Sequence, residues 1–251
     1  MNMNKQLQDL YEELLSKYTL PTQEPPAAFP FLLYIDDEEA FEDKDVVKVM
    51  FFGQEFSGKD WYHYDYRKSV CDNMELYQTF FKSITGSKNK RGLGNGMNIL
   101  IERISKKFPN KSFRFVWNDI VKLYKTGEDD IISPQYYNTV GKEFAKDIIR
   151  GELDIIKPDI IIFLSGPTYD DKLQDIFGDI LFETLPDYKR EDKTGDWERR
   201  DEKWGDFPEK ALAKVHLSDF PDVRFAFRSY HPAAHKNHYP YYFTIRDEIN
   251  L

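Results

Sequence analysis

Two short segments of this chain are apolar at almost every position, and few protein architectures accommodate such segments. They are residues 46–52 (Val-Val-Lys-Val-Met-Phe-Phe) and residues 160–164 (Ile-Ile-Ile-Phe-Leu). A strand that lacks polar positions must be covered on both faces of its sheet, which is typical of parallel strands flanked by helices. The sequence therefore predicts an α/β fold.

Segments whose apolar residues recur at helical spacing separate these strands. One helix is expected to begin at Ser133-Pro134, a cap residue followed by proline at the first helical position, and to end at Pro158. The other expected helices are residues 4–17, 72–84, 97–108, 170–177 and 241–249.

Two further strands, residues 112–117 and 223–228, alternate apolar and polar side chains, which favours edge positions. Sequential strands tend to be neighbours and parallel crossovers are right-handed, so the simplest sheet order is 2-1-3-4, numbered along the chain. We therefore predict a three-layer α/β/α fold with a central four-stranded parallel sheet.

Composition narrows the class of protein. The chain has 251 residues, no apolar run near 18 residues and no basic-then-apolar leader. Its one cysteine, Cys71, excludes an internal disulfide and a cysteine-ligated metal cluster. The net charge of -9 argues against non-specific coating of nucleic acid but leaves a local basic groove open. We expect a soluble, cytoplasmic monomer.

The predicted organisation is an N-terminal helix with a proline-rich connector (residues 1–30), followed by one domain (residues 31–251). Residues 186–210 form a charged insertion in this domain, with Trp197 and Trp204 among the charges. Two interpretations stay open for the insertion: a solvated loop, or a lid whose Trp or Arg side chains stack on the bases of a substrate strand.

Each predicted strand runs directly into a short polar cluster. Because the carboxyl ends of parallel strands share one edge of the sheet, and ligands bind there, we expect the clusters to converge on one cleft. This convergence favours an enzyme. In chain order, the clusters are Gly53-Gln54-Glu55, Asn118-Asp119, Ser165-Gly166-Pro167 and Ser229-Tyr230-His231-Pro232.

Three side chains in these clusters suit catalysis or recognition. Glu55 can act as a general base or an electrostatic stabiliser, and His231 can donate a hydrogen bond to a developing oxyanion. The Asn118 amide can pair with the edge of a pyrimidine. Each residue also has a purely structural interpretation. Glu55 can be a turn residue that caps the next segment, His231 can bond backbone carbonyls, and Asn118 can form a turn.

His231, His235 and His238 have a spacing that suggests a metal site. Pro232 and Pro240 bracket them and disfavour a continuous helix, and no Asp, Glu or Cys lies among them. Metal-dependent hydrolysis is therefore a minor alternative, and we expect neither a metal nor another cofactor.

Four motifs in this order resemble those of the uracil-DNA glycosylase superfamily. The resemblance covers residues 46–249, without the N-terminal helix and the charged insertion. The matching segments are Gly53-Gln54-Glu55, the Asn118 segment at residues 116–122, residues 157–166, and Tyr230-His231-Pro232-Ala233-Ala234, which resembles the His-Pro-Ser motif of the family.

The resemblance implies cleavage of an N-glycosidic bond on a flipped nucleotide, in DNA that contains uracil or another damaged base. Glu55 would stand where the family's Asp positions water, and His231 would stabilise the charge on the departing base. Asn118 would read the base edge and the Gln54 backbone would line the pocket.

The remaining roles also follow from the resemblance. Phe56, or one of three tyrosines, would stack on the base, and the sequence does not choose between them. The tyrosines are Tyr62, Tyr64 and Tyr66. The residues implied to contact the DNA backbone are Ser57, Ser165, Gly166 and Ser229.

The chain also departs from the pattern of this superfamily. Glu55 replaces Asp, Phe56-Ser57 replaces Pro-Tyr, and His235-Lys236 stands where the best-known branch has an apolar wedge. The extra methylene of Glu moves the carboxylate by about one C–C bond, and catalysis is sensitive to shifts of this size in the positions of the reacting groups. A second hypothesis is therefore a non-catalytic member of the same fold that binds nucleotides, nucleic acid or a protein.

Overall fold

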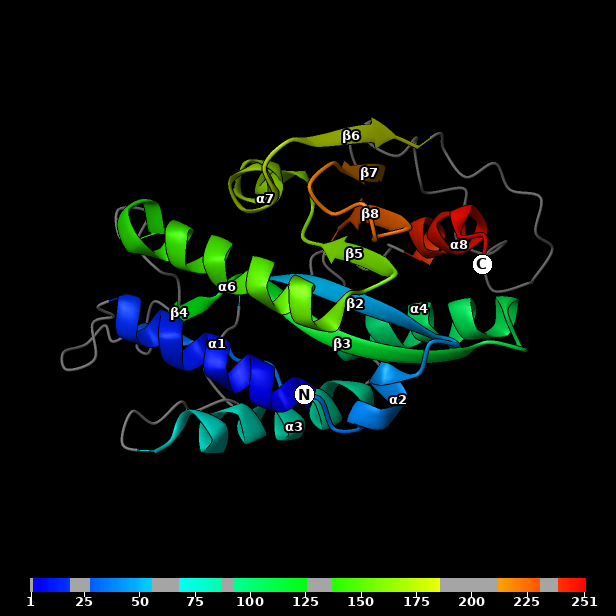
Figure 1. The fold of residues 1–251 in the computed structure, drawn as a ribbon. Helices are drawn as coiled ribbons and strands as arrows, with labels where there is room; N and C mark the ends of the chain where they lie inside the picture. Colours follow the sequence, from blue (N-terminus) through cyan, green and yellow to red (C-terminus); the bar gives the residue numbers. More distant parts are fainter. Residues whose placement is uncertain are drawn as a thin grey trace.

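The computed structural model describes residues 2–18, 28–55, 68–86, 93–125, 137–185, 212–230 and 239–251. The fold is α/β, built on a mixed six-stranded sheet of order β3-β2-β5-β8-β7-β6 (Figure 1). The strands of this sheet are β2 (Val46–Glu55), β3 (Ser112–Val121), β5 (Ile160–Leu164), β6 (Ile180–Thr184), β7 (Ala213–Leu217) and β8 (Phe225–Ser229). A small antiparallel pair joins β1 (Ala28–Pro30) and β4 (Leu123–Lys125).

The helices lie close to the positions expected from apolar spacing. For the longest expected helix, the predicted start at Ser133-Pro134 lies outside the described residues. In the described part, a π-helical turn at Tyr137–Gly141 leads into α6. Lys157, with φ 51°, ends α6 directly before Pro158. The helices are α1 (Met3–Lys17), α2 (Glu38–Glu42), α3 (Val70–Gly86), α4 (Leu93–Lys107), α6 (Lys142–Ile156), α7 (Asp170–Phe177) and α8 (Tyr239–Glu248).

None of these helices within the described ranges is long and apolar enough to cross a bilayer. The charged insertion and most of the proline-rich connector lie outside the described residues. The N-terminal helix α1 packs against α6 and α3.

The four strands expected from the sequence are neighbours in the sheet, and each adjacent pair among them is parallel: β3 with β2, β2 with β5, and β5 with β8. The prediction of a four-stranded, wholly parallel sheet is wrong, because β7 and β6 extend it in antiparallel orientation. The alternating pattern of β8 therefore does not mark an edge. It arises because Arg228 is buried and paired with Asp170 at 3.0 Å.

The first two strands are longer than their apolar runs. They remain paired beyond Phe52 and Trp117, up to the pair Glu55 with Val121. The clusters Gly53-Gln54-Glu55 and Asn118-Asp119 therefore lie inside strands, not after them. The polar side chains of Gln54, Asn118 and Asp119 are compatible with a strand because they find partners in the protein.

Helices lie against both faces of the sheet (Figure 1). On one face, Phe52 and Phe163 pack with each other and with Phe177 of α7 at ring distances of 5.1–5.9 Å. On the other face, Phe108, directly after α4, contacts Phe113 at 6.4 Å. This coverage explains why β2 and β5 carry apolar side chains on both sides.

The open edge of β3 is closed at one point by a tyrosine. The buried Tyr77 hydroxyl of α3 donates to the Trp117 carbonyl and accepts from the Trp117 N–H, both at 2.8 Å. A single side chain thus satisfies both outward-facing backbone groups of an edge residue. Such groups are costly when they are buried without a partner.

We expect Tyr77→Phe to lower the free energy of unfolding by about 1–3 kcal/mol at pH 7, because it leaves both Trp117 groups unpaired. Burial holds the pKa of Tyr77 well above its ordinary value of 10.0. The folded protein therefore keeps this proton when the unfolded chain loses it, so the contribution is present below pH 10 and is lost as the pH rises further. Urea unfolding between pH 7 and 11 should show a shallower alkaline loss in the variant, and equal midpoints at pH 7 would contradict the role.

Candidate functional site

The carboxyl ends of β2, β5 and β8 are tied together by two hydrogen bonds. The Gln54 side-chain amide donates to the Ser165 carbonyl at 2.7 Å, and the Gly166 N–H donates to the Ser229 carbonyl at 2.8 Å. Four of the residues predicted from the sequence, Gln54, Ser165, Gly166 and Ser229, therefore lie together at one edge of the sheet.

Glycine is required at the turn after β5. Gly166 has φ 74°, a region that side chains disfavour, and an added Cβ would lie 3.0 Å from the Tyr230 ring. The turn consequently stays close to the chain that leaves β8. This close approach brings the Ser165-Gly166 and Ser229-Tyr230 clusters into contact.

Two buried hydroxyls lie at this edge. Ser165 Oγ has a long contact of 3.5 Å with the Gly166 carbonyl. Ser229 Oγ is buried and has no hydrogen-bond partner within the described part of the chain. A polar ligand atom that reached Ser229 would satisfy a group whose burial is otherwise unfavourable.

The two residues predicted to perform catalysis are at the limits of what the structure describes. Glu55 is the last residue of β2 and its backbone pairs with Val121; its side chain is outside the description. His231 follows Tyr230 in the sequence and lies outside the described residues. The same holds for Phe56, Ser57, the three candidate stacking tyrosines, His235 and His238. The approach of Glu55 to His231 therefore stays a prediction.

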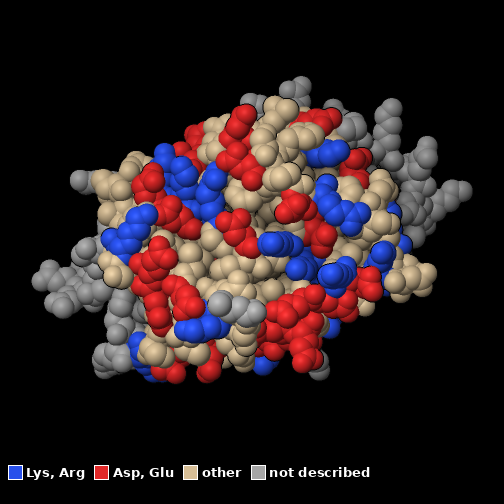
Figure 2. Space-filling model, viewed as in Figure 1, with Lys and Arg blue, Asp and Glu red and all other residues tan. Residues whose placement is uncertain are grey.

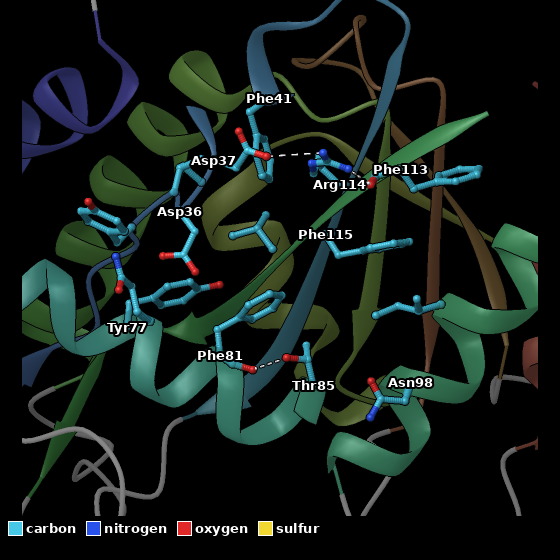
Figure 3. A pocket seen from close by; sticks show the side chains of 15 residues that line it. Asp36, Asp37, Phe41, Tyr77, Phe81, Thr85, Asn98, Phe113, Arg114 and Phe115 are labelled. Atoms are coloured by element: carbon cyan, nitrogen blue, oxygen red, sulfur yellow. Dashed lines mark hydrogen bonds and ion pairs between the residues drawn. The ribbon is translucent and has the colours of Figure 1, made fainter. Parts of the chain in front are cut away.

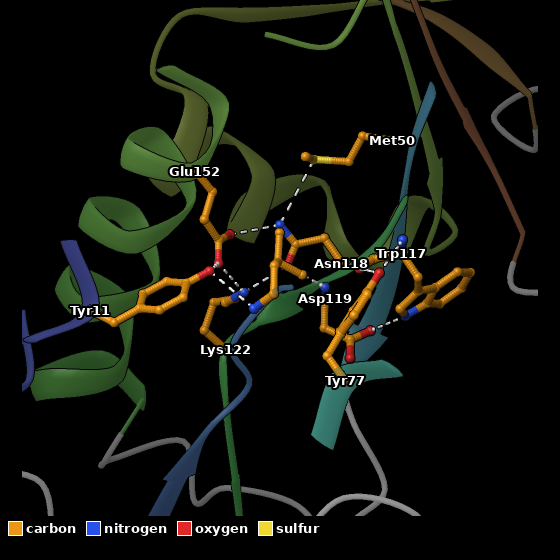
Figure 4. A network of polar contacts seen from close by, with 9 residues as sticks. Tyr11, Met50, Tyr77, Trp117, Asn118, Asp119, Lys122 and Glu152 are labelled. Carbon is orange, nitrogen blue, oxygen red and sulfur yellow. Dashed lines mark hydrogen bonds and ion pairs between the residues drawn. The ribbon is translucent and has the colours of Figure 1, made fainter. Parts of the chain in front are cut away.

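Within the described residues, no hydrogen bond joins Asn118 to Gln54 or Ser165. Asn118 pairs with Phe52, two residues before Gln54 and about 7 Å from it along the strand direction. Its Oδ1 accepts from the Asp119 N–H and from Lys122 Nζ, and its Nδ2 donates to Glu152 at 2.8 Å (Figure 4). Recognition of a base by this amide stays a prediction, and it requires Asn118 to exchange protein partners for the ligand.

The partners of Asn118 belong to a buried charged network. Lys122 and Glu152 form an ion pair at 2.8 Å and both are fully buried. Tyr11 donates its hydroxyl proton to Glu152 at 2.7 Å and accepts from the Leu33 N–H at 3.0 Å. Burial lowers the pKa of Lys122, and the Glu152 carboxylate opposes that effect. The network joins α1, β3 and α6 beneath the sheet edge (Figure 4).

This network was not predicted from the sequence, although the sequence carries a signal for it. The apolar stripe of α6 passes through Phe144 and Ile148 and continues to Ile156, and Glu152 occupies the intervening position at the same four-residue spacing. A carboxylate on the buried stripe of a helix requires a cation or several donors.

The Asp119 carboxylate, next to Asn118 in β3, was also not predicted as a site residue. Asp119 is buried and accepts from Trp117 Nε1 at 3.1 Å. These two side chains lie directly over Gly53, where any Cβ would overlap them. Gly53 in the glycine-containing cluster therefore serves close packing between β2 and β3.

A buried cation lies next to Ser229 along β8. Arg228 pairs with Asp170, the first residue of α7, and its guanidinium lies 5.4 Å from the Phe182 ring. Burial lowers the pKa of Arg228 and the Asp170 carboxylate opposes that effect. The pair fixes the start of α7 against the end of β8.

Within the described ranges, no group of three or more His, Cys, Asp or Glu side chains is arranged to hold a metal ion. No protein-family model matches this chain, and no curated protein matches it either. The functional interpretation therefore depends on the geometry of the sheet edge and on the resemblance of the motifs.

Proposed function

We propose that the edge formed by the ends of β2, β5 and β8 binds a flipped nucleotide in DNA, and that the protein hydrolyses its N-glycosidic bond. The base would be uracil or another damaged base, and the frame a three-layer α/β/α domain of the uracil-DNA glycosylase type. The observation that carries the proposal is the pair of hydrogen bonds that joins Gln54 to Ser165 and Gly166 to Ser229. Glu55 and His231 flank this cluster in the sequence.

In the proposed reaction, Glu55 positions a water molecule and stabilises positive charge on the sugar. The water oxygen bonds to C1′ while the bond from C1′ to the base nitrogen breaks, the electron pair of that bond leaves with the base, and the Glu55 carboxylate takes the proton that the water loses. His231 donates a hydrogen bond to the resulting anion. Phe56 stacks on the base. The Ser165 and Ser229 hydroxyls contact phosphate or sugar oxygens, which requires that their buried positions open to the ligand.

The test is a gel assay with labelled oligonucleotides that carry uracil, hypoxanthine or xanthine, in single- and double-stranded form. With enzyme in excess, at least one substrate should give alkali-labile abasic product, and the matched undamaged oligonucleotide should give none. Absence of product from all of them would contradict the proposed activity.

Asn118 favours a second candidate function, which is binding without catalysis. Its amide already uses both its acceptor and its donor side on protein groups, so base recognition as implied by the resemblance has a structural cost. A protein of this kind should be stabilised by nucleotides or DNA in a thermal-shift assay and should release no base.

A further inference from the structure

A cavity of about 350 Å³ lies beside the edge strand β3, where α3, α4 and the segment before α2 approach it (Figure 3). Phe115, which lines it, is six residues from Val121, so the cavity is about 20 Å along the strand from the proposed catalytic edge. Six of its fifteen lining residues are aromatic. The aromatic residues are Tyr34, Phe41, Tyr77, Phe81, Phe113 and Phe115.

The backbone of β3 is open at this cavity. Arg114 Nη1 donates a hydrogen bond to the Phe113 carbonyl at 3.0 Å, and the Tyr77 hydroxyl bonds both the N–H and the carbonyl of Trp117. Phe115 lies between them and, since alternate residues of a strand direct their backbone groups to the same side, its N–H and C=O also point away from β2. Within the described part of the chain, neither group has a hydrogen-bond partner. One residue of an incoming strand can pair here.

The mouth of the cavity is acidic. The Asp36 and Asp37 side chains are 44% and 59% exposed, and they face the cations of Lys82 (3.9 Å) and of Arg114 (3.4 Å), which also lines the cavity. These ion pairs are long and exposed and contribute little free energy, so a ligand cation can compete for both carboxylates. Acidic side chains gather over α2 on the surface (Figure 2). The segment of residues 36–45, which contains α2, has one basic residue, Lys44. Its acidic residues are Asp36, Asp37, Glu38, Glu39, Glu42, Asp43 and Asp45.

We propose that this cavity is the docking site for a basic, extended peptide segment of a partner protein. The peptide backbone pairs with Phe115, in the manner of a strand added to a sheet edge. The alkyl stem of a Lys or Arg side chain enters between the aromatic walls, and its cation stays at the mouth beside Asp36 and Asp37. Backbone pairing, apolar contact and charge each favour the same occupant.

The probe is a fluorescein-labelled peptide, Lys-Leu-Lys-Leu-Lys, titrated into the full chain and followed by fluorescence anisotropy. We expect saturable binding that weakens with added salt, and no binding of the charge-reversed peptide Glu-Leu-Glu-Leu-Glu. Methylation of the backbone nitrogen at the central residue should weaken binding, because it removes the donor to the Phe115 carbonyl.

Two variants test the site itself. Asp36→Asn with Asp37→Asn should weaken binding about fivefold; Asn retains the helix-capping ability that Asp37 supplies to the Ala40 N–H. Gln78→Trp, a half-buried lining position, should fill the cavity and abolish binding while the thermal midpoint shows that the protein is folded. The matched control, Asp9→Asn with Glu12→Gln on exposed positions of α1, changes the net charge equally and should bind as the wild type does.

Failure of the wild-type chain to bind the Lys peptide would overturn the proposal, as would an equal loss of affinity in the α1 control. Sedimentation velocity tests whether a second copy of the chain occupies the cavity instead. A dimer of the wild type that Gln78→Trp dissociates would show that a second copy of the chain, not a basic peptide, fills the cavity. None of these results depends on base-release activity.

Discussion

Glu152→Ala is expected to lower the free energy of unfolding by about 3–5 kcal/mol, the range for removing one partner of a buried ion pair. The substitution leaves the Lys122 ammonium without its carboxylate in a fully buried position. It also removes the acceptor of the Tyr11 hydroxyl and of the Asn118 amide. Urea unfolding at pH 7, followed by circular dichroism, measures the change.

A double variant separates the energy of the pair from the penalty of breaking it. Glu152→Leu with Lys122→Met replaces both charges by apolar groups and should be less destabilised than Glu152→Ala, because no unpaired charge remains. Glu143→Ala, at an exposed position on the same helix, should stay within about 0.5 kcal/mol of the wild type. A loss below 1 kcal/mol for Glu152→Ala would show that the network contributes little.

Much of the framework follows from local sequence patterns. The continuous apolar runs identify β2 and β5, and the spacing of apolar residues identifies α1, α3, α4 and α7, because both patterns record which faces are buried. The strand β6 was missed because it is short and largely exposed or half-buried, so its sequence carries neither a continuous run nor a clear alternation. The strand β7, Ala-Lys-Val-His-Leu, does alternate buried apolar residues with polar ones, so a signal for it was present in the sequence.

The site was predictable only as far as topology determines it. Parallel strands bring their carboxyl ends to one edge, and that is sufficient to place Gln54, Ser165 and Ser229 together. The position of Asn118 depends on where β3 ends and on which side chains face it. Those are long-range properties: Glu152 and Lys122 reach it from α6 and from further along the chain, and no short motif encodes their approach.

His231→Ala is expected to slow base release by about 10²–10³-fold in single-turnover assays with enzyme in excess, if the proposed reaction is correct. Removing the donor to the departing base raises the barrier of the chemical step, and enzyme excess isolates that step from product release. Glu55→Gln should give a loss of similar size, because it keeps the size of the side chain and removes the charge that stabilises the sugar cation. Both variants should retain the wild-type thermal midpoint.

His216→Ala is the matched control for the histidine. His216 is exposed on β7 and contacts Glu183 at 3.0 Å. Since Ala213 pairs with Arg228 in antiparallel orientation, His216 lies about 10 Å further along β7, away from the carboxyl end of β8. Its loss should leave the rate of base release unchanged. Equal single-turnover rates for His231→Ala and the wild type would remove the histidine from the reaction and, with it, the mechanism proposed for this edge of the sheet.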